Sequence, residues 1–233
     1  MTNHPAKYNK PILDVISQVI KNNYPTQPIS ILDCFGGVGG IHDLSSDTWG
    51  TYAIEIEREW ADVSREKGWT DWGDFFDFKP YTAWFRQDEH KYAPSPTMFD
   101  VVAVSTTYGN RMADHHEAKD YSKRMTYRHQ LGRPLTENNS GGMQWGPDYR
   151  TFHEAAWTKV RTLLEYGGLL ILNVKDHVRK GEVIKVCDWH KDFITHEVGM
   201  TCIDDIKVPV NGMGFGANGK SRVDHERVIV FLK

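Results

Sequence analysis

The chain has 233 residues, 39% of them hydrophobic, which is enough apolar material for one large globular domain. Its formal charge is −3, so no positive field of the whole protein indicates nucleic acid, and such contact must come from a local patch. Three widely separated cysteines without CxxC spacing argue against a zinc ribbon or a disulfide framework: Cys34, Cys187 and Cys202. The absence of a signal peptide or a long apolar run predicts a cytosolic protein.

Helix-like and strand-like segments alternate through the first half of the chain. Apolar spacing predicts a helix over residues 10–22 and a buried strand over 29–35. Further strands are expected at 51–56, near 72–76 and at 99–104. This order predicts an α/β fold with a mostly parallel sheet.

The second half continues this order after one long interruption. Helices are predicted at 149–164 and 183–198, and strands at 169–174, 202–208 and 227–232, which makes seven strands in total. Residues 109–148 have no sustained apolar period and are too many for an ordinary connection. We therefore predict a long insertion directly after the fourth strand.

The first part of this insertion is basic and aromatic. Residues 109–133 contain three acidic side chains against six basic ones: Arg111, Lys119, Lys123, Arg124, Arg128 and Arg133. Two tyrosines and three histidines are interleaved with them. Such a surface can contact phosphates and stack on bases, or it can be a lid over a small substrate, and these residues alone favour neither interpretation.

Two segments carry the features of a ligand site. The first strand ends at Asp33 and is followed by glycines that allow tight turns against a ligand: Gly36, Gly37, Gly39 and Gly40. The fourth strand ends in a short polar segment with Ser105 and Tyr108. Open α/β sheets bind ligands at the carboxyl ends of parallel strands, so we expect both segments at one edge.

Together these motifs resemble a known family. D-C-F-G-G-V-G at residues 33–39, the acidic end of the second strand, the Gly73–Asp74 pair and S-T-T-Y at 105–108 are similar to the motifs of small phage-type and actinobacterial DNA amino-methyltransferases. The resemblance covers nearly the whole chain and implies a single Rossmann-like methyltransferase domain over 1–233. It also implies S-adenosylmethionine as cofactor, contacted by Asp33, Phe35, Gly36, Gly37, Gly39, Glu55 and Asp74.

The same resemblance assigns the catalytic segment. In the family a Ser/Asp/Asn-Pro-Pro-Tyr motif directs acceptors at an exocyclic amine and stacks an aromatic ring on the flipped base. The matching residues are Ser105, Thr106, Thr107 and Tyr108, so two threonines stand where the family has prolines. The change is a tolerated variant, a site retuned for another base or donor, or the mark of a cofactor-binding or DNA-binding protein with weakened catalysis.

The resemblance further implies a partner and a target. Double-stranded DNA is the expected partner, with cytosine N4 favoured over adenine N6 and the insertion 109–148 as recognition surface. Expected DNA contacts are Arg111, Lys123, Arg124, Arg128 and Arg222. No obligate protein partner, membrane or metal is inferred, and the cytoplasm of a bacterial or phage-infected cell is the expected location. An RNA or small-molecule methyltransferase is a further hypothesis.

Overall fold

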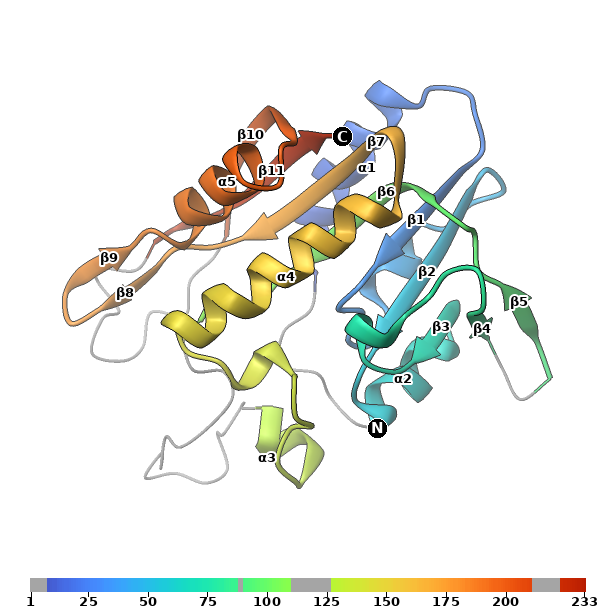
Figure 1. Ribbon diagram of the computed structural model, residues 1–233, viewed down its shortest axis with the longest axis horizontal. Helices are drawn as coiled ribbons and strands as arrows, with labels where there is room; N and C mark the ends of the chain where they lie inside the picture. The colour runs from blue at the N-terminus through green and yellow to red at the C-terminus, as the bar shows by residue number, and fades with distance from the viewer. Residues whose placement is uncertain (1–7, 88–89, 110–126, 211–222) are drawn as a thin grey trace.

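A computed structural model describes residues 8–87, 90–109, 127–210 and 223–233, and the side chains of Arg128 and His129 lie outside this description. Within the described residues, nine strands form one sheet in the order β10-β11-β7-β6-β1-β2-β3-β4-β5 (Figure 1). The strands are β1 Ile29–Asp33, β2 Trp49–Glu55, β3 Trp69–Trp72, β4 Trp84–Arg86, β5 Tyr92–Pro94, β6 Phe99–Ser105, β7 Leu164–Val174, β10 Thr201–Pro209 and β11 His225–Leu232. A separate hairpin pairs β8 His177–Arg179 with β9 Glu182–Ile184.

The middle of the sheet is parallel and its two sides are antiparallel. Strand β1 pairs in parallel with both β2 and β6, β2 does so with β3, and β6 does so with β7. Strands β11 and β10 are added antiparallel on one side, and β4 and β5 on the other. The carboxyl ends of β1, β2, β3, β6 and β7 therefore meet at one edge, where ligands bind in such folds.

Seven of these strands correspond to the predicted ones, and the predicted total of seven is wrong. The additional strands β4 and β5 have 3 residues each, too few for a periodic signal. When these two strands are counted, the insertion follows the sixth strand along the chain and not the fourth. The predicted third strand near 72–76 lies earlier, at β3, because Asp74 accepts a hydrogen bond from the Phe76 N–H and starts a 3-10 turn there.

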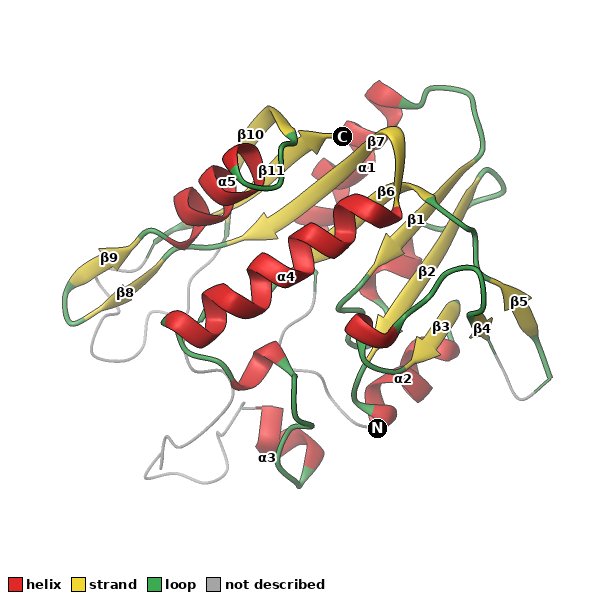
Figure 2. Ribbon diagram, in the orientation of Figure 1, coloured by secondary structure: helices red, strands yellow, loops and turns green. Residues whose placement is uncertain are grey.

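The helices cover both faces of the sheet, as Figure 2 shows. They are α1 Lys10–Asn23, α2 Arg58–Arg65, α3 Tyr127–Leu131, α4 Pro147–Leu163 and α5 Val186–His196. The helix predicted at 183–198 begins later than expected, because Glu182–Ile184 pairs in the hairpin. The insertion 109–148 is not a simple loop in its described part, since it contains α3, a 3-10 turn at Ser140–Gly142 and the first residues of α4.

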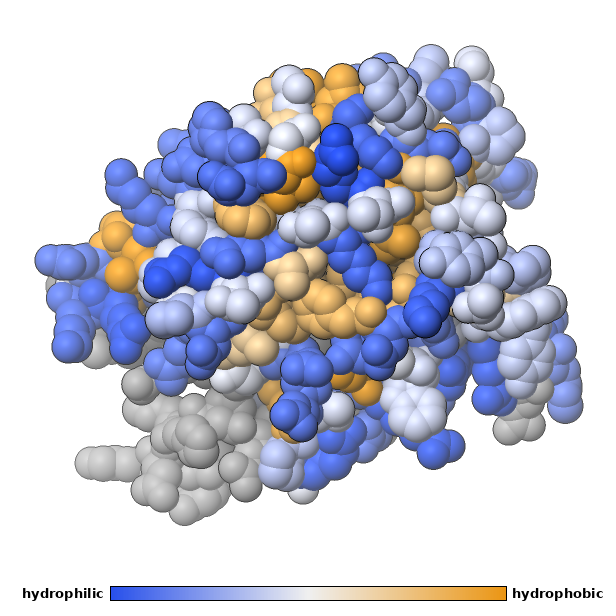
Figure 3. Space-filling view, viewed as in Figure 1, coloured by the Kyte–Doolittle hydropathy of each residue, from blue (hydrophilic) through white to orange (hydrophobic). Residues whose placement is uncertain are grey.

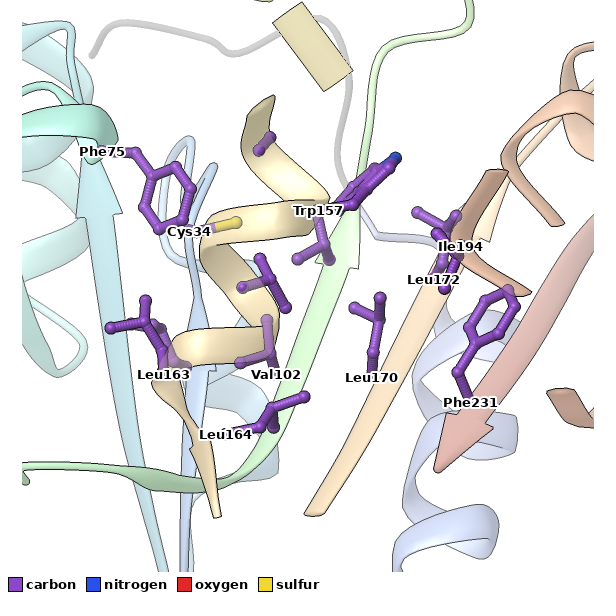
Figure 4. Close-up of a cluster of buried hydrophobic side chains, with 14 of the residues drawn as sticks. Cys34, Phe75, Val102, Trp157, Leu163, Leu164, Leu170, Leu172, Ile194 and Phe231 are labelled. Atoms are coloured by element: carbon purple, nitrogen blue, oxygen red, sulfur yellow. The ribbon is translucent and has the colours of Figure 1, made fainter. Parts of the chain in front are cut away.

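Two apolar layers enclose the sheet. On one face, α4 and α5 pack on the strands around Trp157, Leu172 and Phe231, which Figure 4 shows together with other members of this cluster. On the other face, α1 covers the alternate residues of the same strands, among them Ile31 and Ile171. Because both faces of the central strands are covered, these strands are mainly apolar.

Hydrophilic side chains cover most of the molecular face seen in Figure 3, with smaller hydrophobic patches between them. No helix among the described residues is long and apolar enough to cross a membrane.

Candidate active site

A cavity of about 530 Å³ opens at the carboxyl ends of β1, β2 and β6. The glycine loop after β1 and the polar turn 105–108 after β6 both line it, as the sequence predicts for a shared ligand edge. The predicted residues that line it are Asp33, Phe35, Gly36, Gly37, Glu55, Asp74, Ser105, Thr106, Thr107 and Tyr108. The remaining predicted cofactor residue, Gly39, lies beside Ser64 of α2 and not on the cavity wall.

The glycine loop is pressed against β2. The Gly36 N–H donates to the Ile54 carbonyl at 2.8 Å, and a Cβ at Gly36 would lie 2.8 Å from the Ala53 Cβ. Gly37 has a φ of 52°, which L-residues with side chains seldom adopt. The glycines therefore serve the close approach to β2 and also leave the cavity wall without side chains.

Asp33, at the end of β1, is 1% exposed and satisfied by two donors. Its Oδ1 accepts from the Phe35 N–H at 3.0 Å, and its Oδ2 accepts from the Tyr8 hydroxyl at 3.1 Å. Burial raises the pKa of Asp33 to about 7, although these donors oppose the shift. Tyr8, which lines the cavity, is a site residue that the sequence analysis missed, because its contact depends on α1 folding over β1.

Glu55 ends β2 and holds two backbone amides. Its Oε2 accepts from the Gly37 N–H at 2.7 Å and its Oε1 from the Glu57 N–H at 2.7 Å. Burial raises the pKa of Glu55 to about 8. The carboxylate thus joins the glycine loop to the start of α2, and Glu55 also lines the cavity.

Asp74 and Phe35 complete this end of the cavity. Asp74 caps the 3-10 turn at Phe75–Asp77 and also accepts from Asn138 Nδ2 at 3.1 Å. The Phe35 ring packs against Phe75 and Phe152, with ring centroids 5.8 and 5.7 Å away. An aromatic wall beside hydrogen-bond acceptors suits a planar heterocycle with an amino group.

The turn after β6 is fixed by hydrogen bonds that proline cannot make. The Thr106 N–H donates to the Asn173 carbonyl at 3.2 Å, and Thr106 Oγ1 lies 2.5 Å from His153 Nε2. Because His153 Nδ1 lies 2.8 Å from the Tyr149 carbonyl, which only accepts, Nδ1 carries the proton and Nε2 accepts from the threonine hydroxyl. Burial lowers the pKa of His153 to about 4, so the ring is neutral.

Thr107 is held by two hydrogen bonds. Its hydroxyl donates to the Ser140 carbonyl at 3.1 Å, and its own carbonyl accepts from the Tyr149 hydroxyl at 2.5 Å. Tyr149 in turn lies 3.0 Å from His190 Nε2, while the Trp157 indole donates to His190 Nδ1 at 2.9 Å. An indole N–H can only donate, so His190 Nδ1 accepts and His190 Nε2 donates to the Tyr149 hydroxyl. The Tyr149 hydroxyl then donates to the Thr107 carbonyl.

Ser105 and Tyr108 flank the threonines and lie near Glu226. Asn173 Nδ2 donates to Ser105 Oγ at 3.1 Å and to Glu226 Oε2 at 2.9 Å. Burial, followed by the nearby Glu226 charge, raises the pKa of Tyr108. Asn173 therefore supports Ser105.

The sequence analysis missed His153, Tyr149, His190 and Glu226. The signal available in the sequence was the spacing of His153, which follows Tyr149 by 4 positions and so lies on the same face of α4. In the structure both side chains are 0% exposed. Glu226 likewise precedes the apolar run of β11. Neither signal identifies the partner, which comes from a distant element.

Several predicted residues fall outside the described part of the chain. These are Arg111, Lys123, Arg124 and Arg222, together with the side chain of Arg128. At the insertion's ends, the Trp145 N–H donates to the Gly109 carbonyl at 2.9 Å, and its ring packs on Tyr149. Trp145 thus anchors the insertion. Among the described residues, no three His, Cys, Asp or Glu side chains gather to hold a metal ion.

No protein-family model matches the sequence, and no curated protein is significantly similar to it. Solved structures, in contrast, resemble the fold across most of its length, and they are S-adenosylmethionine-dependent methyltransferases and other methyltransferases. The chain therefore has the α/β, Rossmann-like fold of methyltransferases, with a mixed sheet and a mostly parallel core.

Three similar structures illustrate the likeness. A methyltransferase from Pyrococcus furiosus aligns with a TM-score of 0.52 at 13% identity, over 99% of this chain and 87% of its own. A putative RNA methyltransferase from Pyrococcus horikoshii gives 0.51 at 11% identity, over 94% and 81%. A TehB-like S-adenosylmethionine-dependent methyltransferase from Corynebacterium glutamicum gives 0.50 at 15%, over 93% and 86%. At such identities the likeness supports the fold and does not identify a substrate.

Proposed function

We propose that this chain is an S-adenosylmethionine-dependent DNA methyltransferase that modifies an exocyclic amino group of a flipped base, with cytosine N4 favoured over adenine N6. The observation that carries the proposal is that the glycine loop and the turn 105–108 line one cavity. A methyl donor and a planar amine held there would meet at the short distance that an in-line displacement requires.

The residues at the cofactor end fit S-adenosylmethionine, which the structural neighbours also support. Asp33, Glu55 and Asp74 offer carboxylates to a ligand that carries an ammonium group, ribose hydroxyls and an adenine amine. Gly36 and Gly37 leave room beside them, and Phe35 offers an aromatic wall. The cofactor, when bound, supplies an electrophilic methyl group.

The threonines of the turn are compatible with catalysis. Replacing prolines releases two φ angles, which costs rigidity of about 0.4–1 kcal/mol each. The bonds from Thr106 to His153 and to the Asn173 carbonyl restore rigidity by another route. This supports an active variant over a weakened cofactor-binding or DNA-binding protein.

Mass spectrometry of nucleosides tests the proposal directly. DNA of mixed sequence is incubated with protein and cofactor, digested and analysed, and we expect N4-methylcytosine, or else N6-methyladenine. Ser105→Ala is the matched control, because it removes the proposed acceptor hydroxyl and leaves the glycine loop intact. RNA and small amines are tested in parallel. Cofactor binding without any methylated product would favour the non-catalytic alternative.

DNA contact is tested by the salt dependence of binding. Alanine at Arg111, Lys123, Arg124, Arg128 or Arg222 is expected to weaken DNA binding and to reduce the salt slope by about 1 for each phosphate that the variant no longer neutralises. The Lys10→Ala variant is a suitable control, because Lys10 pairs with Asp14 on the exposed side of α1. If the salt slope of DNA binding were unchanged in all five variants, the insertion would not be the DNA-binding surface.

A further inference from the structure

Glu226 is a buried carboxylate in the cavity wall that the proposed function leaves without a role. It is 7% exposed and lines the same cavity as Ser105 and Tyr108. Its position follows from topology: β11 runs antiparallel to β7, with Val228 opposite Asn173, so β11 begins where β6 and β7 end. The carboxylate is thus brought to the polar turn from more than 100 residues away along the chain, since Asn173 donates both to it and to Ser105.

Among the described residues, one side-chain hydrogen bond ends at the Glu226 carboxylate. Asn173 Nδ2 donates to Oε2 at 2.9 Å, and this donor is neutral. A carboxylate has about four lone-pair sites, so one donor leaves capacity for a further N–H from the cavity.

The chemistry of amine methylation requires such an acceptor. The nitrogen of a nucleobase amine has two hydrogens, and its lone pair becomes available when acceptors draw on them. Ser105 Oγ already receives Asn173 Nδ2, which leaves it less able to take an amine hydrogen as well. After methyl addition the nitrogen is also strongly acidic, and one proton must leave it.

We propose that Glu226 accepts an N–H of the substrate amine and takes the proton that is released on methylation, an inference that rests on the proposed function. As the N–C bond forms, the C–S bond of the donor breaks with its electron pair on sulfur. The N–H bond then breaks with its pair on nitrogen, and Glu226 becomes a neutral carboxylic acid. An anionic carboxylate and a sulfonium thus give a neutral acid and a neutral thioether, so charge balances.

A binding experiment tests the amine contact without turnover. NMR titrations with 2′-deoxycytidine and its analogue without the 4-amino group are made in the presence of S-adenosylhomocysteine. The pair 2′-deoxyadenosine and its analogue without the 6-amino group is tested likewise. We expect the wild type to prefer the aminated member of one pair by about tenfold, as for a hydrogen bond to a charged group, and Glu226→Gln to lose this preference.

Asp224→Asn is the matched control, because it removes the charge of an exposed carboxylate two positions from Glu226. This variant should keep the amine preference. Equal loss in both variants would mean that the preference follows local charge and not a contact with Glu226, and an unchanged preference in Glu226→Gln would also overturn the inference.

Turnover provides the second test. Glu226→Ala should lower kcat by about 100-fold or more, as for loss of a general base, and added formate should restore part of it. Cofactor affinity by calorimetry should be unchanged. Wild-type rates in Glu226→Ala would overturn the inference and leave the proposed function standing. Absence of any methylated base with wild-type protein would instead refute the proposed function.

Discussion

The two ends of the cavity are built from contacts at different distances along the chain. At the cofactor end, Gly37 binds Glu55, 18 positions away, and Phe35 binds Asp33, 2 positions away. At the substrate end, the turn 105–108 is held by partners that lie 42, 47 and 68 positions away: Tyr149, His153 and Asn173. Local sequence motifs therefore describe the first end well, and only tertiary packing forms the second.

The two ends also differ in their buried ionisable groups. Buried carboxylates with raised pKa values, Asp33 and Glu55, stand at the cofactor end. The two imidazoles beneath the turn are neutral, because burial lowers the pKa of His153 to about 4 and also lowers the pKa of His190. We expect the cofactor end to respond to pH and the turn to respond to the loss of single hydrogen bonds.

The largest effect is expected for Thr106→Pro, which restores a family residue. Proline removes both the N–H bond to the Asn173 carbonyl and the hydroxyl bond to His153, and leaves both buried acceptors unpaired. We expect a loss of about 2–5 kcal/mol in the free energy of unfolding, with a matching loss of methylation. Denaturant unfolding and methylation assays measure it.

Thr106→Val is the matched variant, because it keeps the N–H and removes only the hydroxyl. It should lose less free energy of unfolding and less methylation than Thr106→Pro. A gain of methylation on restoring proline at position 106 would contradict the role given to these bonds. It would show that the threonines weaken the site.

Tyr149→Phe should have the next largest effect. It removes the hydroxyl between His190 Nε2 and the Thr107 carbonyl, and leaves both without this partner. The expected loss of stability is about 1–3 kcal/mol. Calorimetric affinity for S-adenosylhomocysteine should stay unchanged, and a large loss there would show that the two ends are not separable.

The pH dependence of stability tests the cofactor end. The folded pKa values of about 7 for Asp33 and about 8 for Glu55 lie above their ordinary values, so the folded state binds more protons. Stability is then fully present at low pH and is lost as pH rises from near 4 through 8, by up to about 1.4 kcal/mol per pH unit per group. Urea unfolding at several pH values measures this slope.

Glu55→Gln should flatten the upper part of that slope, whatever its effect on absolute stability. An identical slope in the variant would show that Glu55 ionises normally when folded.

The smallest effect concerns the affinity for the cofactor. S-adenosylmethionine carries a positive sulfonium, so its affinity should rise as Asp33 and Glu55 ionise, by about tenfold at most between pH 6 and 8.5. Calorimetry at both pH values provides the measurement. S-adenosylhomocysteine, without that charge, should show a weaker dependence, and equal dependence would exclude attraction by these carboxylates.

The amino-acid sequence determined the parts that depend on near neighbours. The apolar run of β1, the acid at its end and the glycines after it predict a strand and a tight turn, because these features act within a few residues. The alternation of helices and strands likewise predicted the α/β class. The additional hairpin β4–β5 was not predicted, since strands of 3 residues are too short to show an alternation of apolar and polar residues.

Tertiary structure alone decided what surrounds the turn 105–108. In the sequence, His153 lies between Phe152 and Glu154, and Glu226 lies between His225 and Arg227. Only the packing of α4 and the order β11-β7-β6 bring His153 to Thr106 and Glu226 to the cavity that Tyr108 lines. The physical reason is that a buried polar group must find a partner in space, and its sequence neighbours do not specify which one.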